Sequence, residues 1–261
     1  YPFALADIPA AVLTIPFVSS VMSIAWIFGS LIYVKDLDYQ FYQSFRNLRE
    51  AYQNMYPSMR LGGAIYPSYV SFEEIDIDNR QSGSLFSGGL DAIATYIRHK
   101  DNLKYLIYTN GFFESNIPDS AYESETSIIS DFAHTCKVKP VFVKSNSCKF
   151  IDLELLTRKN RKHIGGFWHD FYHSQTFLGM SSIVAVHYKL PEMYIGSSNT
   201  PDCWVHCASD PTIDIEFRFS GVSVVHDGFE LNRQEKLRIV IEQVQKTGIP
   251  INLHVCSFNK H

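Results

Sequence analysis

The chain has 261 residues, is 46% hydrophobic and carries a formal net charge of −4. This composition excludes a disordered chain and is sufficient for a large hydrophobic core. The weakly negative charge gives no general attraction to nucleic acid or anionic membranes, so we expect neither as a partner.

The cysteines favour a reducing compartment. There are five, an odd number, at irregular spacing, and no secretory signal is visible ahead of them. We therefore expect free thiols and a cytoplasmic location.

Residues 8–34 carry no charge and are long enough to cross a bilayer. Pro9 and Pro16 interrupt the run, and residues 31–34 have the pattern of a strand. The run favours a buried helix followed by a buried strand, and a membrane anchor is the alternative.

Residues 37–56 have helical spacing and end before Pro57. We assign residues 1–80 to an N-terminal accessory region that could shape substrate choice or dock a protein partner.

From about residue 81 to residue 261, strand-like and helix-like stretches alternate. Short apolar runs predict strands at 84–86, 105–108, 139–144 and 193–195, and longer patterns predict helices at 121–136 and 171–190. Alternation of this kind predicts an α/β domain with an open, mostly parallel sheet and helices on both faces.

The first of these strands runs into Ser87-Gly88-Gly89-Leu90-Asp91-Ala92 and then a helix-like stretch. Adjacent glycines allow a sharp turn, and the N-terminus of the following helix attracts anions, so the segment predicts a phosphate loop. It is not the commoner loop, because no G-x-x-x-x-G-K-[ST] sequence occurs. A simple glycine turn with Asp91 as a helix cap is the alternative.

Polar residues also follow the other predicted strands. They are Thr109, Asn110 and Gly111, then Ser145 and Asn146, then Gly196, Ser197 and Ser198. Ligands of open α/β sheets bind outside the carboxyl ends of the strands, so these segments predict one common site.

Residues 87–91 resemble the S-G-G-x-D-S signature of the PP-loop ATP pyrophosphatases, whose adenine nucleotide α-hydrolase-like domain has the HUP type of fold. The resemblance extends over the second two-thirds of the chain. It is nearest to 7-cyano-7-deazaguanine synthase and synthase-like proteins of bacterial defence operons. The further matching phrases are V-K-S-N at 143–146, Y-I-G-S-S at 194–198, S-D-P at 209–211, H-D-G at 226–228 and L-H-V-C at 253–256.

The resemblance implies attack on the α-phosphorus of ATP, release of pyrophosphate, and an adenylylated carboxylate that a nitrogen or sulfur nucleophile displaces. Ser87, Gly88 and Gly89, flanked by Leu90 and Ala92, would hold the β- and γ-phosphates. Asp91 would hold the loop or a Mg²⁺ ion.

The remaining family positions have both a functional and an ordinary structural interpretation. The cations Arg233 and Lys236 would stabilise developing charge, or lie on a solvated helix face. His173 would border the active site, or be a buried histidine bonded to a carbonyl group.

Three polar residues and the segment Gly196-Ser197-Ser198 complete the predicted set. Asn146 would position the nucleotide or the carboxylate substrate, and Gly196, Ser197 and Ser198 would contact the nucleotide. Asp210 and Asp214 would bind a second Mg²⁺ or a substrate amine, although Asp210 could equally cap a helix before Pro211.

Two departures from the family concern a missing hydroxyl and a missing zinc site. Ala92 stands where the signature ends in Ser, and relatives continue from the position of Cys256 into further cysteines that bind zinc, whereas this chain ends five residues later. Structural zinc needs four ligands, so Zn²⁺ is expected only in a longer chain. Cys203, His206 and Cys207 offer another cluster, for which a structural role is favoured.

The sequence therefore predicts an ATP-dependent, Mg²⁺-requiring ligase that activates a carboxylate of a 7-deazaguanine precursor or of a protein or peptide. The alternative is a nucleotide-binding interaction subunit of a defence system that has lost or altered its chemistry.

Overall fold

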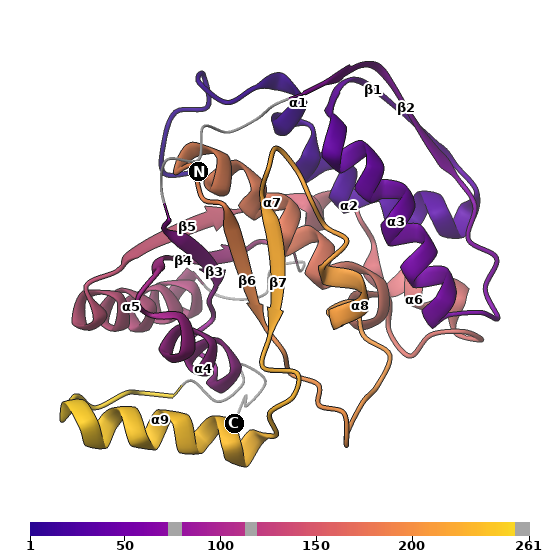
Figure 1. Ribbon diagram of the computed structural model, residues 1–261. Helices are drawn as coiled ribbons and strands as arrows, with labels where there is room; N and C mark the ends of the chain where they lie inside the picture. Colours follow the sequence, from indigo (N-terminus) through magenta and orange to yellow (C-terminus); the bar gives the residue numbers. More distant parts are fainter. Residues whose placement is uncertain (73–79, 113–118, 254–261) are drawn as a thin grey trace.

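The computed structural model describes residues 1–72, 80–112 and 119–253 (Figure 1). Its N-terminal elements are α1 (Ala10–Leu13), α2 (Ile15–Phe28), β1 (Leu31–Asp38), α3 (Tyr39–Met55) and β2 (Ala64–Ser71). The buried helix expected within residues 8–34 and the helix expected over 37–56 are confirmed. The strand expected after the first helix also forms, but it is not buried as predicted, because Leu31 and Tyr33 of β1 are exposed. No helix in the described part of the chain is both long and apolar enough to cross a membrane.

The remaining elements alternate between strand and helix. They are β3 (Ser82–Leu85), α4 (Leu90–His99), β4 (Leu103–Asn110), α5 (Asp119–Cys136), β5 (Lys139–Lys144), η1 (Ser147–Lys149), α6 (Leu153–Asn160), η2 (Trp168–Tyr172), α7 (His173–His187), β6 (Glu192–Gly196), α8 (Pro211–Asp214), β7 (Ser223–Asp227) and α9 (Arg233–Thr247). The long helix expected over 171–190 is divided, because its first turn is the π-helical turn η2.

Strands β3 to β7 form one parallel sheet in the order β5-β4-β3-β6-β7. The chain winds outward from β3 to β5, then crosses back to β6 on the other side of β3. The expected α/β class with a parallel sheet is thus confirmed. The carboxyl ends of β3 and β6 lie side by side where the winding direction reverses, the point at which such sheets bind ligands.

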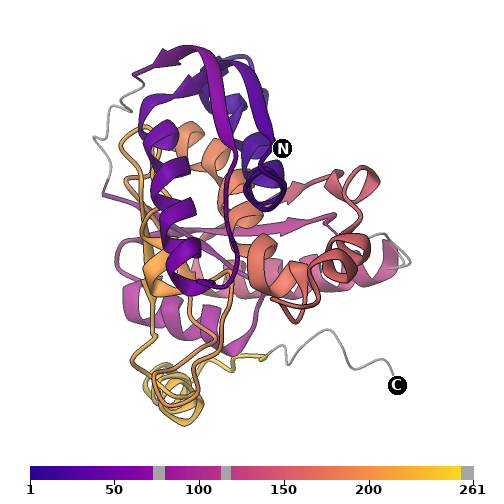
Figure 2. The same cartoon turned by 90° about the vertical axis from the view of Figure 1, so that its right-hand side faces the viewer.

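Both faces of this sheet are buried, and successive strand residues point to opposite faces. Met193 and Ile195 face one core, whereas Tyr194 between them faces the other. Helix α7 packs against the first face, and α4, α5 and α9 lie on the second. Figure 2 shows the N-terminal elements stacked on the α7 side and α9 on the opposite side.

The N-terminal region continues the core on the α7 side. Helix α2 packs directly on α7, where Gly179 faces Ser19 so closely that any side chain at position 179 would collide with the serine. From α3, the hydroxyl group of Tyr52 donates to the carbonyl oxygen of Ala208 at 3.2 Å. The N-terminal region is therefore packed onto helix α7, which covers one face of the sheet, and its helix α3 contacts the segment that leads into the site.

Candidate functional site

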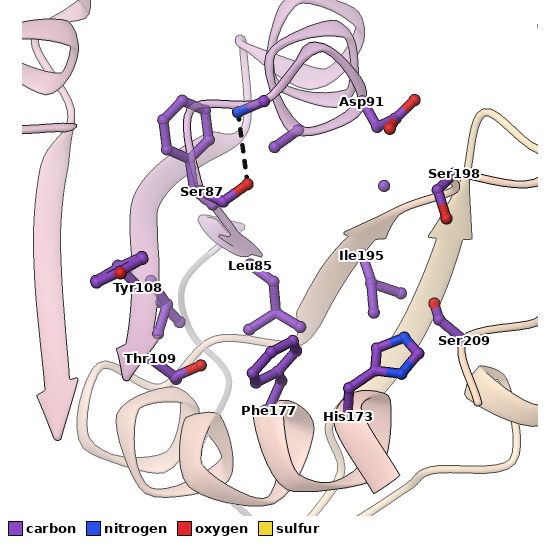
Figure 3. A pocket seen from close by; sticks show the side chains of 15 residues that line it. Leu85, Ser87, Asp91, Tyr108, Thr109, His173, Phe177, Ile195, Ser198 and Ser209 are labelled. Atoms are coloured by element: carbon purple, nitrogen blue, oxygen red, sulfur yellow. Dashed lines mark hydrogen bonds between the residues drawn. The ribbon is translucent and has the colours of Figure 1, made fainter. Parts of the chain in front are cut away.

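A cavity of about 280 Å³ opens at the carboxyl ends of β3, β4 and β6 (Figure 3). Its walls come from the loop after β3, the first turn of α4, the ends of β4 and β6, and helix α7. The lining residues are Leu85, Phe86, Ser87, Gly89, Asp91, Ala92, Ile107, Tyr108, Thr109, His173, Phe177, Ile195, Gly196, Ser198 and Ser209. The predicted strand-end segments after β3, β4 and β6 therefore do meet in space, whereas Ser145 and Asn146 after β5 do not line the cavity.

The loop between β3 and α4 has the geometry of an anion cradle. Gly88 has a φ of +76°, a left-handed conformation that residues with a Cβ rarely adopt. Gly89 is the N-cap of α4, and no side chain caps that helix end. Helices α3, α6, α8 and α9 have carboxylate or amide caps, from Asp38, Asp152, Asp210 and Asn232 respectively, whereas α1, α2 and α7 also lack a side-chain cap. The first N–H groups of an α-helix have no partner within the helix, so this end of α4 has the donors that an anion in the cavity would need.

Gly196 lets the end of β6 approach this helix closely. A Cβ at position 196 would lie 2.9 Å from the backbone carbonyl group of Asp91 and 3.1 Å from Oγ1 of Thr95. Only glycine fits here without displacing α4. Gly196 also lines the cavity, and its lack of a side chain lets the first turn of α4 lie close to the end of β6.

Lys236 lies beneath the loop and not in the cavity. Its side chain is 2% exposed, and its ammonium group is 2.8 Å from Oδ1 of Asp91. The same group donates a short hydrogen bond to the backbone carbonyl oxygen of Ser197. Lys236 therefore ties the first turn of α4 to the end of β6, and its charge is already paired.

Arg233 is the exposed first residue of α9 and does not line the cavity. Arg98 makes ion pairs at the carboxyl end of β7. Its guanidinium group lies 3.4 Å from the carboxylate of Asp227 and 2.7 Å from that of Glu230. The sequence offered no signal for Arg98, because its partners are more than a hundred residues away. Asn146 is likewise exposed, in the turn after β5.

His173 lines the cavity from the first turn of α7, as Figure 3 shows. Its Nδ1 lies 3.1 Å from the carbonyl oxygen of Trp168, and its Nε2 lies 3.8 Å from Sγ of Cys207. Burial lowers the pKa of His173, although the Trp168 carbonyl group opposes this shift. Burial also raises the pKa of the Cys207 thiol to about 11. The imidazole is therefore neutral and the thiol protonated at pH 7.

Asp214 accepts three hydrogen bonds behind the cavity. Its fully buried carboxylate accepts from Ser209 Oγ at 2.8 Å, from His226 Nδ1 at 2.7 Å and from Ser174 Oγ. Of these four residues, Ser209 lines the cavity. Asp214 thus orients a cavity residue without facing the cavity itself.

Asp210 caps helix α8, which was the alternative to binding Mg²⁺ or a substrate amine. It accepts from the backbone N–H of Thr212 at 2.9 Å and from the indole N–H of Trp204 at 2.7 Å. Neither Asp210 nor Asp214 lines the cavity.

The cysteine–histidine trio does not gather into a metal site. Cys203 is exposed, Cys207 is buried beside His173, and the His206 ring contacts Tyr56 and Trp204. Within residues 1–72, 80–112 and 119–253, no three His, Cys, Asp or Glu side chains come together as metal ligands. Cys256 lies outside the described residues.

Part of the cavity wall was not predicted from the sequence. Tyr108 and Phe177 were given no role, and Ser209 was noted only within a family phrase. Phe177 could have been found from helical spacing, since it lies four residues after His173 and so on the same helix face. Tyr108 directly precedes Thr109 at the end of its strand.

In the comparisons with known proteins, no family model matches this chain and no significant match is found among curated proteins.

Proposed function

We propose that the protein binds ATP with Mg²⁺ in this cavity and uses it to activate a carboxylate, breaking the bond between the α- and β-phosphorus positions. The observation that supports this most is the helix end at Gly89. Its N–H groups lack a capping side chain, it follows a glycine with positive φ, and it faces a cavity at the reversal point of the sheet.

The residues present suit a polyphosphate. Ser87 offers a hydroxyl donor and the backbone of Gly88 offers an N–H donor, and the α4 dipole favours negative charge. The N–H group of Gly89 donates to Oγ of Ser87 at 3.4 Å (Figure 3). Asp91 lines the cavity and engages Lys236 through Oδ1, which leaves Oδ2 as an oxygen ligand of the kind Mg²⁺ prefers. A bound Mg²⁺ would neutralise phosphate charge. The fold's contribution is to hold the phosphates and the carboxylate substrate in a fixed relation.

One observation favours the second candidate, a nucleotide-binding subunit without catalysis. None of the described residues that line the cavity is Lys or Arg. Charge stabilisation in the transition state is commonly a large part of catalysis, so a cavity with few cations depends strongly on Mg²⁺ and on backbone N–H groups.

Product analysis distinguishes the candidates. The protein would be incubated with ATP, Mg²⁺, ammonium as the nucleophile that displaces AMP, and a panel of 7-deazaguanine carboxylates and peptides, and the nucleotides separated by chromatography. AMP and pyrophosphate are expected. ADP with phosphate would contradict the proposed bond choice, and unchanged ATP together with ATP-dependent thermal stabilisation would favour the binding subunit.

A charge-matched pair of variants tests the location. Ser87→Asp places a carboxylate in the cavity, whereas Ser124→Asp places one on an exposed part of α5. Because both variants add one negative charge, they differ only in whether that charge lies in the cavity, where it would repel the phosphates of ATP. ATP binding by thermal shift should weaken in the first variant and persist in the second; equal binding by both would place the nucleotide elsewhere.

A further inference from the structure

We propose that Ser209 and His173, here called the accepting pair, select a ligand group that donates a hydrogen bond at the side of the cavity opposite the phosphate loop. The inference rests on the proposed function only for the identity of the ligands. The geometry that supports it is independent of ATP.

Ser209 has one hydroxyl proton, which it already donates to the carboxylate of Asp214. Its Oγ lies 2.8 Å from Oδ2 of Asp214, and an ionised carboxylate can only accept hydrogen bonds. Asp214 has no exposed side-chain surface and accepts from two further groups, so its orientation is fixed. Ser209 therefore presents lone pairs to the cavity.

The neutral His173 ring likewise has one N–H proton, and that proton is already donated. The carbonyl oxygen of Trp168 can only accept, so Nδ1 of His173, 3.1 Å away, carries the proton. In the neutral ring Nε2 is then an acceptor, which agrees with the protonated thiol of Cys207 beside it. The S–H group is a weak donor at 3.8 Å and leaves the lone pair accessible to a stronger donor.

The two ends of the cavity consequently have opposite hydrogen-bonding character. The phosphate loop supplies donors, whereas Ser209 and His173, which lie near each other in Figure 3, supply acceptors. A phosphate or carboxylate next to the accepting pair would bring its own lone pairs against those of Ser209 and His173, and no hydrogen bond would form. An N–H or O–H group would be bound, and the sources available are the amino group of adenine and a neutral amine nucleophile.

The experiment compares Ser209→Ala with Ser198→Ala. Both serines line the cavity, but among the described contacts only the Ser209 hydroxyl is tied to a carboxylate. Thermal shift would give the affinity of each protein for ATP·Mg²⁺ and for inosine triphosphate·Mg²⁺, which has a 6-oxo group in place of the amino donor. AMP release at increasing ammonium concentration would give the KM for ammonium.

If the donor belongs to adenine, the wild type should bind ATP about five- to tenfold more tightly than inosine triphosphate, the value of one hydrogen bond. Ser209→Ala should abolish this preference, and Ser198→Ala should keep it. If the donor is the amine, both nucleotides should bind equally, and Ser209→Ala should raise the KM for ammonium by a similar factor. Ser209→Thr, which retains the hydroxyl group, should restore either effect.

Identical behaviour of Ser209→Ala and Ser198→Ala in both measurements would overturn the inference. The tautomer of His173 provides a readout that needs no nucleotide: ¹H–¹⁵N NMR of the imidazole ring should show the proton on Nδ1, and a proton on Nε2 would also overturn it. A wild type that gains no stability from ATP but has the Nδ1–H tautomer would refute the proposed function and leave the accepting pair intact.

Discussion

The ammonium nitrogen of Lys236 lies 2.8 Å from Oδ1 of Asp91, across 145 residues of sequence. The lysine side chain is almost fully buried, and the aspartate side chain is 24% exposed. A cation buried in this way is tolerated because it is paired. Lys236, which the sequence predicted to stabilise departing phosphate, instead holds together the first turn of α4 and the end of β6, between which the cavity opens.

Asp91→Ala should therefore destabilise the protein as well as affect ligand binding. Removing one partner of a fully buried pair costs roughly 3–5 kcal/mol. Partial exposure of Asp91 and the remaining bond from Lys236 to Ser197 reduce the expected cost to about 1–3 kcal/mol. Urea unfolding measures it, with Asp131→Ala on the exposed surface of α5 as the control. The double variant Asp91→Ala/Lys236→Met should recover part of the loss, and equal stability of Asp91→Ala and the control would disprove the pairing role.

Gly196→Ala should displace the first turn of α4. The new methyl group would meet the backbone of Asp91 at 2.9 Å, and backbone cannot rotate away as a side chain can. Overpacking of this kind costs about 1–3 kcal/mol, and ATP-dependent stabilisation should fall as well. Gly166→Ala is the matched control, since its methyl group would meet no atom within 4 Å. The idea fails if both variants melt at the same temperature and bind ATP equally.

Gly179→Ala tests the packing of the N-terminal region on α7. The added methyl group would collide with Ser19, which is fully buried in α2. We expect a loss of about 1–3 kcal/mol in the free energy of unfolding. Ser19→Gly in the same chain should remove the collision and recover part of the loss. If Gly179→Ala were as stable as the wild type, α2 and α7 would have to be packed less closely than described.

His173 should make the stability depend on pH below about 6.5. Burial lowers its folded-state pKa below the ordinary value of 6.5, so between these two values the unfolded chain binds more protons than the folded one. Stability is then complete above pH 6.5 and falls as the pH decreases toward the folded pKa. In His173→Gln this part of the loss should disappear, whereas replacement of the exposed His134 by Gln should retain it. Chemical unfolding at pH 7 and pH 5 measures the difference, and parallel losses in both variants would rule out His173 as the source.

Local patterns in the sequence predicted most of the secondary structure. Short apolar runs marked β3, β4, β5 and β6, because both faces of a parallel sheet are buried and its strands need little polar alternation. The strands β2 and β7 were not predicted. Strand β2 contains Pro67 and mainly exposed tyrosines, and it is held by parallel pairing with the distant β1. Such pairing leaves no local pattern.

In the site, the loop of residues 87–91 and the polar residues after each strand could be predicted from local patterns. These follow from chain-local rules: glycine permits positive φ, and parallel strands all end at one edge. Which of those residues face the cavity depends instead on tertiary packing. Lys236 is turned toward Asp91, Arg233 toward solvent, and Ser209 is oriented by Asp214. Side-chain direction and hydrogen-bond partners depend on packing between segments far apart in the chain, and no local sequence pattern encodes them.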